Sequence, residues 1–175
     1  MTGTQETIDG RPALRFERRL PHAIERVWRA VSEPAELAQW FVAPVSWVPE
    51  EGETFEAAGD TGRVTTLDPP RTLAWEWGAE RYRFELSAAD NYTTTLVFTH
   101  VFSGALGPDW QHAAGWETYF NRLEVHLGGG HLSEEEAHEG IDARMADYKE
   151  AFAASQSSEV RARPASSATL NSGSG

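Results

Sequence analysis

The stretch PDWQHAAGWETYFNRLEVHL, residues 108–127, decides the fold. Apolar residues recur in it at intervals of three and four, which is the period of one face of an α-helix: Ala113, Trp116, Phe120, Leu123 and Leu127. Asp109 is placed to cap the first turn, and the glycines at 128–130 end the pattern. We therefore predict one amphipathic helix over 108–127, and its apolar face needs a sheet to pack on.

The composition limits the classes of function. The chain has 175 residues, of which 11% are aromatic, so it can build a domain with a sizeable core. Lys and Arg number 15 against 27 Asp and Glu, which gives a net charge of −12. Such a surface repels phosphate groups and anionic lipids. We therefore expect no nucleic-acid partner and no stable membrane association.

The residues that usually hold metals or covalent intermediates are scarce. Cysteine is absent, which removes disulfides, thiolate nucleophiles and Cys-ligated zinc, and the only lysine is Lys149, in a charged segment. No HExxH pattern, phosphate loop or dinucleotide fingerprint is present. We expect no metal and no cofactor. Because the sequence shows no signal-peptide pattern and no long apolar run, we also expect a cytoplasmic protein.

Short strand-like segments precede the long helix. Residues 13–20 alternate as a half-buried strand does, except that Arg18 falls on the apolar side, where we expect it to snorkel at an edge. Two short helices are predicted next, over 21–31 and 34–40. Further strands are then predicted at 44–48, 54–58, 63–67, 72–77, 81–87 and 93–102. Regular short strands joined by tight turns indicate an antiparallel meander.

The alternation also predicts which side chains share a face of the sheet. Trp75 and Trp77 lie on one face of their strand, and the following strands repeat the pattern with Tyr82 and Phe84, then with Phe98 and His100. Stacked side by side, these faces form an aromatic concave surface for the helix to cover.

A second helical region follows the glycines. Ser133 and Glu136 form a capping-box pattern, and Ala137, Ile141, Met145, Tyr148 and Phe152 continue as an apolar stripe. The remaining residues are rich in Ser, Ala and Gly. We therefore predict a flexible leader at 1–12, a main domain at 13–130, one appended amphipathic helix at 131–154 and a disordered tail at 155–175.

Four stretches carry a family resemblance: IERVWRAVSEPAELAQWF (24–41), LDPPRTLAWEW (67–77), TLVFTH (95–100) and HAAGWETYFNRL (112–123). In this order they resemble the START-related helix-grip superfamily, the Bet v-like or SRPBCC group, and within it the bacterial branch similar to the activator of the heat-shock-protein-90 ATPase. The resemblance implies an α+β helix-grip fold: a curved antiparallel sheet wrapped around a long C-terminal helix, with two short helices after the first strand. It also implies a hydrophobic cavity between sheet and helix.

The fold alone does not fix the function. Members of the superfamily bind lipids, polyketides or plant hormones, act as cyclases or aromatases, sequester toxic natural products or serve as cochaperone domains. Ten residues are candidates to line a ligand pocket here: Phe41, Trp75, Trp77, Phe84, Phe98, His100, His112, Trp116, Tyr119 and Phe120. The aromatic ones could equally fill the core, and Trp75 favours the core.

Three residues near the expected cavity have more than one interpretation. Gly115 costs the helix about 1 kcal/mol relative to Ala, which indicates close approach of a strand, a neighbouring helix or a ligand. His100 and His112 could orient a ligand or act as acid and base, or they could be structural, hydrogen-bonded histidines.

Three hypotheses for function follow. The leading one is binding of a small hydrophobic or aromatic molecule between sheet and helix, for sequestration, transport or sensing. The second is a polyketide cyclase or aromatase-like enzyme that uses His100 and His112, and the third is a chaperone-associated interaction domain. We expect a monomer or weak dimer.

Overall fold

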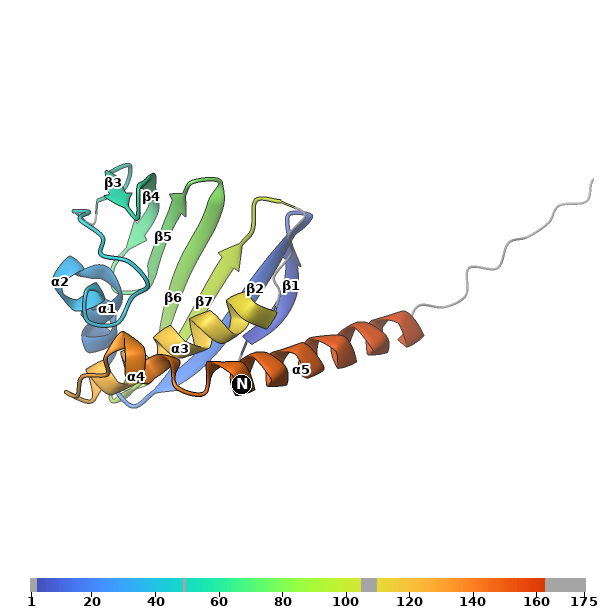
Figure 1. The fold of residues 1–175 in the computed structure, drawn as a ribbon. Helices are drawn as coiled ribbons and strands as arrows, with labels where there is room; N and C mark the ends of the chain where they lie inside the picture. Colours follow the sequence, from blue (N-terminus) through green and yellow to red (C-terminus); the bar gives the residue numbers. More distant parts are fainter. Residues whose placement is uncertain (1–2, 49, 105–109, 163–175) are drawn as a thin grey trace, which may run out of the picture.

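Consecutive hairpins build the sheet, since most strands pair with their neighbours in sequence. The strands are β1 (Gly3–Ile8), β2 (Arg11–Leu20), β3 (Thr54–Ala57), β4 (Asp60–Asp68), β5 (Thr72–Trp77), β6 (Glu80–Asp90) and β7 (Thr93–Val101). In the computed structural model, which describes residues 3–48, 50–104 and 110–162, they form one seven-stranded antiparallel sheet in the order β1-β2-β7-β6-β5-β4-β3 (Figure 1). The α+β helix-grip fold predicted from the sequence is confirmed.

Side chains on the inner face of the sheet align in rows across the strands. Trp75 of β5 pairs with Tyr82 of β6, which pairs with His100 of β7. The register of β4 shifts between Val64 and Thr66, and a bulge of this kind increases the local bend of a sheet. The inner face is therefore concave, as the sequence predicts.

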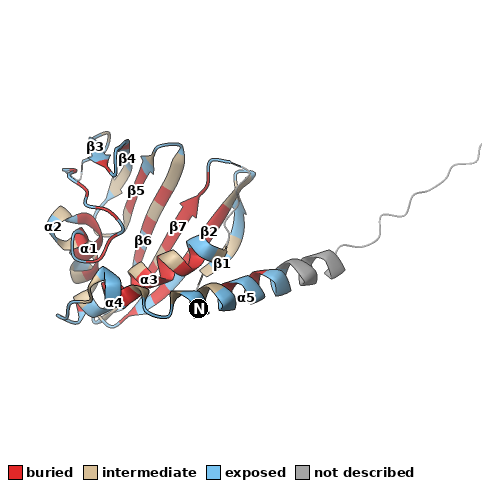
Figure 2. Cartoon of the chain, in the orientation of Figure 1, coloured by how far each residue is buried: buried red, intermediate tan, exposed pale blue. Residues whose placement is uncertain are grey.

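The long helix α3 (Trp110–Leu127) lies across this concave face (Figure 1). Ala113, Phe120 and Leu123 are fully buried beneath it, which confirms the apolar face expected from their spacing. Figure 2 shows the buried residues on the strands that α3 crosses. Burial of each large side chain here contributes about 1.5–3 kcal/mol. The predicted cap, Asp109, lies outside the described residues.

Two short helices follow β2, as predicted: α1 (Ile24–Ser32) and α2 (Pro34–Leu37). The strand predicted at 44–48 is wrong, because this segment is irregular. Its alternation has another cause: Val45 and Trp47 are buried, and the Trp47 indole Nε1 donates to the carbonyl oxygen of Ser32 at 2.8 Å. The segment therefore packs under α1 instead of joining the sheet.

The predicted flexible leader at 1–12 is wrong for the part that the structure describes. Residues 3–8 form the edge strand β1, which pairs antiparallel with β2. None of its residues is fully buried and half are exposed, and accordingly the strand shows no apolar alternation in the sequence. As an edge strand it has one neighbour in the sheet, and its backbone hydrogen bonds to β2 hold it in place.

The C-terminal region contains two helices where the sequence predicts one. The capping box at Ser133 and Glu136 is present and starts α4 (Glu134–His138), but Gly140, with φ of +71°, ends it, and α5 (Ile141–Ala162) begins anew. Positive φ is readily adopted by glycine and interrupts a helix. Because α5 continues to Ala162, the predicted boundary at 154 is also wrong, and residues 163–175 lie outside the described part of the chain.

Candidate functional site

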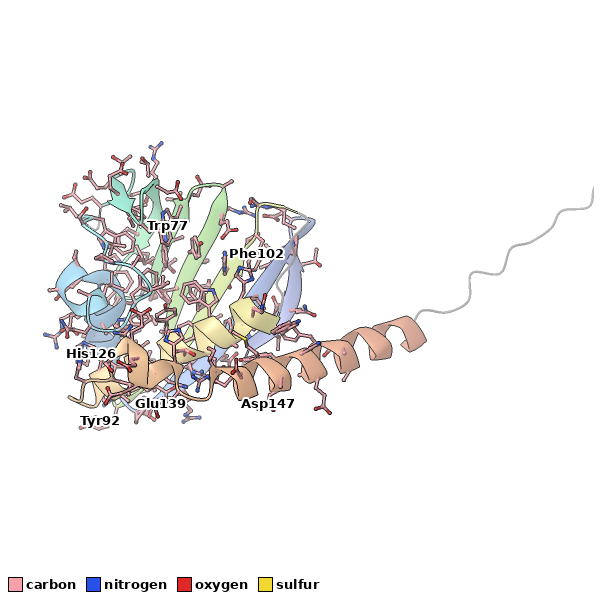
Figure 3. The ribbon with its side chains drawn as sticks, viewed as in Figure 1. Trp77, Tyr92, Phe102, His126, Glu139 and Asp147 are labelled. Atoms are coloured by element: carbon pink, nitrogen blue, oxygen red, sulfur yellow. The ribbon has the colours of Figure 1, made fainter. Side chains whose placement is uncertain are left out.

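A pocket of about 520 Å³ lies between the inner face of the sheet and the first half of α3. We call it the aromatic pocket, and its lining consists of Val42, Trp77, Glu80, Tyr82, His100, Gln111, His112, Gly115, Trp116 and Tyr119. Its volume is within the range of about 300–1,000 Å³ that is usual for small-molecule sites. In Figure 3, Trp77, which lines the pocket, and Phe102 lie toward the end of the sheet opposite Tyr92.

A chain of hydrogen bonds links α3 to the sheet at the wall of the pocket. The indole Nε1 of Trp116 donates to Nδ1 of His100 at 3.1 Å, and Nε2 of His100 lies 2.6 Å from Oε2 of Glu80. The hydroxyl of Tyr82 donates to the same Glu80 oxygen at 3.0 Å. Trp116, which comes from the helix, is thereby fixed against two strands.

The partners of His100 determine its tautomer. Trp116 can only donate, so Nδ1 must accept, and the single imidazole proton resides on Nε2 and points at Glu80. Burial lowers the pKa of His100 more strongly than the neighbouring Glu80 carboxylate raises it. His100, with 3% of its surface exposed, is therefore a neutral residue that positions Glu80.

Glu80 keeps its charge in this position. The hydrogen bond from His100 lowers the pKa of Glu80 and outweighs the opposing effect of burial, and the Tyr82 hydroxyl adds to the lowering. Burial, and after it the negative charge of Glu80, raise the pKa of Tyr82. The site thus combines an ionised carboxylate with a neutral imidazole and a neutral phenol.

Gly115 leaves a gap in the helix wall of the pocket. A Cβ atom built on it would meet no described protein atom within 4 Å, so neither a strand nor a neighbouring helix explains the glycine. The sequence allows three explanations for Gly115, namely close approach of a strand, of a neighbouring helix or of a ligand. The third agrees best with this geometry.

The structure divides the ten predicted site residues into two equal groups. Five line the aromatic pocket: Trp77, His100, His112, Trp116 and Tyr119. The other five are buried in the core: Phe41, Trp75, Phe84, Phe98 and Phe120. Core rings also pack against residues that line the pocket: the ring centroid of Phe98 lies 4.5 Å from that of Trp116.

Sequence reasoning missed Glu80, Tyr82, Val42 and Gln111 as lining residues. The signal for Glu80 was present: it shares the inner face with Tyr82 because the two are separated by one residue on β6. The strand predicted from the sequence begins at Arg81, whereas β6 begins at Glu80, so the prediction leaves this acid outside the strand. Gln111 lies four residues before Gly115 and therefore shares its face of the predicted helix, whereas Val42 lies in an irregular segment that no pattern marks.

A second hollow, of about 280 Å³, lies on the outer face of the sheet. Its lining includes outward-facing charged residues such as Arg83 and Glu85, and its volume is smaller than that of the aromatic pocket. Among the described residues, no group of three His, Asp or Glu side chains is arranged to hold a metal ion. No helix in the described ranges is long and apolar enough to cross a membrane.

Comparison with known proteins now identifies the family. Residues 21–128 match the family model described as "Activator of Hsp90 ATPase homolog 1-like protein". The chain belongs to this family. The resemblance predicted from four sequence stretches is confirmed, and this family lies within the helix-grip, or SRPBCC, superfamily. The matched range begins after β1 and β2 and ends before α4 and α5.

Solved structures share the fold of this activator-like protein. CalU16 from Micromonospora echinospora is 23% identical, with 87% of this chain and 94% of that chain covered and a TM-score of 0.67. The Aha1 dimer from Colwellia psychrerythraea is 19% identical, with 66% and 95% covered and a TM-score of 0.55. DynU16, described as a putative protein in the dynemicin biosynthetic locus, is 26% identical, with 68% and 48% covered and a TM-score of 0.57. No curated protein matches the sequence.

Proposed function

We propose that this protein binds a small aromatic or hydrophobic molecule in the aromatic pocket. The observation that carries the proposal is the ring-rich wall, in which Trp77, Tyr82, Trp116 and Tyr119 surround a volume of about 520 Å³. Aromatic side chains give a planar ligand a large contact area and a preferred geometry. The similarity to DynU16, from a biosynthetic locus, supports a small molecule as the partner. Sequestration, transport or sensing in the cytoplasm remains the role predicted from the sequence.

The state of the histidines favours binding over acid–base catalysis. Both nitrogens of His100 are engaged, one by Trp116 and one by Glu80, so neither is free to exchange a proton with a ligand. His112 is exposed at the rim, and its ring packs edge-on against Phe102 at 5.2 Å between centroids. A cyclase or aromatase mechanism that uses both histidines would need His100 to leave its two partners.

Replacing Gly115 by leucine tests the proposal, because a Cβ atom at this position meets no described atom within 4 Å and the rest of the new side chain would occupy space in the pocket. Leucine is a better helix former than glycine, so we expect Gly115→Leu to raise the free energy of unfolding by up to about 1 kcal/mol. We also expect it to abolish binding of 1-naphthalenemethanol, a neutral aromatic probe. Isothermal titration calorimetry and urea unfolding measure the two effects on the same samples.

Val125→Leu is the matched control, since Val125 is exposed on the same helix and does not line the pocket. The control should bind the probe as the wild type does. The proposal fails if the wild type binds neither this probe nor its charged analogues more tightly than about 1 mM. It also fails if Gly115→Leu binds them unchanged.

A contact with a chaperone is the second candidate, favoured by membership of a family described as activators of a chaperone ATPase and their homologues. The similarity to the dimeric Colwellia protein is likewise compatible with a weak dimer. Addition of the protein to the host's chaperone should then change its ATPase rate. An unchanged rate at saturating protein would remove this candidate.

A further inference from the structure

The carboxylate of Glu80 has one engaged oxygen and one open oxygen. Both of its protein hydrogen bonds, from His100 and from Tyr82, go to Oε2. Oε1 accepts no hydrogen bond from the residues that the structure describes. The side chain keeps 32% of its surface exposed and lines the aromatic pocket. An ionised oxygen in this position can accept a hydrogen bond from a ligand.

Negative charge dominates around the pocket, although the electrostatic effect of His112 at its rim lowers the pKa of Glu80 as well. A third hollow, of about 380 Å³, adjoins the aromatic pocket: the two share Trp77, Glu80 and Tyr82, and Asp60 also lines this hollow. Among the described lining residues of both hollows there is no Lys or Arg. The net charge of −12 gives the whole molecule the same sign. Such a field attracts cations and repels anions.

The two arginines near the pocket walls are held by backbone groups. Arg11 donates from Nε to the carbonyl oxygen of Phe102 and from a terminal nitrogen to that of Ala79, both at 2.9 Å. Arg122, which lies over the Tyr119 ring, donates to the carbonyl oxygens of two loop residues. Neither guanidinium lines the pocket, so neither is placed to pair with an anionic ligand.

The rings complete a site for a positive charge. Trp77 and Trp116 border the wall near Glu80, and the ring centroid of each lies 6.1 Å from that of Tyr82. Tyr82 itself stacks on Trp75 and on His100, so the two tryptophans are the rings that can face a ligand. The face of an aromatic ring attracts a cation, most strongly in tryptophan. A carboxylate oxygen bordered by such rings therefore recognises a cationic group better than a neutral one.

From this arrangement we infer that the ligand class is a small aromatic amine in its protonated form, whose ammonium group donates to Oε1 of Glu80 while its rings pack against Trp77 and Trp116. The inference rests on the proposed function and specifies its ligand. The hydrogen bond selects an ammonium with N–H groups, and the enclosure by rings selects a planar ring system. An aromatic carboxylate would meet Glu80 with a like charge.

Three probes with one ring system test the inference at pH 7: 1-naphthylmethylamine, 1-naphthalenemethanol and 1-naphthoate. The wild type should bind the amine at least about tenfold more tightly than the alcohol, because a hydrogen bond between charged groups is worth more than one to a neutral donor. The carboxylate should bind most weakly. Calorimetric titration gives the three dissociation constants.

Glu80→Gln changes the recognition without removing the internal network. The Gln oxygen can still accept from His100 and Tyr82, and its amide nitrogen would take the place of the open Oε1 as a donor. We expect the preference for the amine to fall to less than about twofold. Glu76→Gln, on the outer face of β5, removes the same charge at an exposed position and should keep the preference.

Each other outcome overturns a stated part of the inference. If the alcohol or the carboxylate binds the wild type as tightly as the amine, the ligand class is wrong while the proposed function holds. If the amine preference survives in Glu80→Gln, the carboxylate is not the recognising group. If none of the three probes binds, both the proposed function and the inference fail.

Discussion

At the scale of single residues, the environment of His100 links protonation to stability. Burial lowers its pKa below the ordinary value of 6.5, so the unfolded chain takes up a proton at a higher pH than the folded chain does. As the pH falls below 6.5, the unfolded state is therefore stabilised relative to the folded one. The contribution of a neutral, buried His100 is complete above that value and is lost on acidification.

His100→Gln should remove this pH dependence. The free energy of unfolding of the wild type should decrease from pH 7 to pH 5 by more than that of the variant, because the variant has no imidazole to protonate at this position. Urea unfolding at several pH values measures the difference, and the other five histidines cancel in the comparison. If the free energy of unfolding of the wild type instead increased relative to that of the variant between pH 7 and pH 5, His100 would be charged in the folded protein.

At the scale of elements, a buried ion pair fastens α5 to the rest of the domain. A terminal nitrogen of Arg18 on β2 lies 2.8 Å from Oε1 of Glu117 on α3, and the hydroxyl of Tyr148 on α5 donates to the other Glu117 oxygen. Tyr148 also accepts from the backbone nitrogen of Gly3 at 3.1 Å. Arg18, expected to snorkel at an edge, is instead buried, and four elements meet at this cluster.

Removing the charge of Glu117 should loosen this junction. Burial raises the pKa of Glu117, but the hydrogen bond from Tyr148 and the charge of Arg18 outweigh it, so the carboxylate is ionised. Glu117→Gln should cost about 3 kcal/mol of unfolding free energy, the lower end of the range for breaking a buried pair, because Arg18 keeps Glu124. Hydrogen exchange should rise first in α5.

Glu124→Gln is the matched control for this prediction. Glu124 pairs with the same Arg18 at 3.2 Å, but 49% of its side chain is exposed. An exposed pair contributes less than about 1 kcal/mol. Equal losses in the two variants, or unchanged exchange in α5, would contradict the view that the buried pair fastens this helix.

At the scale of the whole molecule, local periodicity explains what could be predicted from the sequence. The helix over 108–127 and the inner faces of the strands follow from spacing alone. The break between α4 and α5 does not, because Ala137 and Ile141 keep helical spacing across Gly140. The edge strand β1 has no apolar face, so its pairing with β2 defines it and its own sequence pattern does not.

The division between core and pocket depends on three-dimensional packing. Phe98 and His100 lie on the same face of β7, yet Phe98 is covered by Phe120 and Trp116, whereas His100 reaches the pocket. The alternation along a strand shows which side chains face inward, but it does not show which of them the helix α3 covers. Gly115 supplies the one local sign, a helix position without a side chain, and its meaning required the geometry.

The central claim, that the aromatic pocket binds a small aromatic molecule, is tested most directly by the indole N–H signals of the seven tryptophans in a ¹H–¹⁵N spectrum during titration with 1-naphthylmethylamine. The signals of Trp77 and Trp116 should shift and saturate. Those of Trp40 and Trp47, whose indoles donate to backbone carbonyls of α1 outside the pocket, should stay in place. Saturable shifts confined to the two pocket indoles and lost in Gly115→Leu are the predicted result. Shifts that are absent, spread over all seven indoles or unchanged in Gly115→Leu would contradict it.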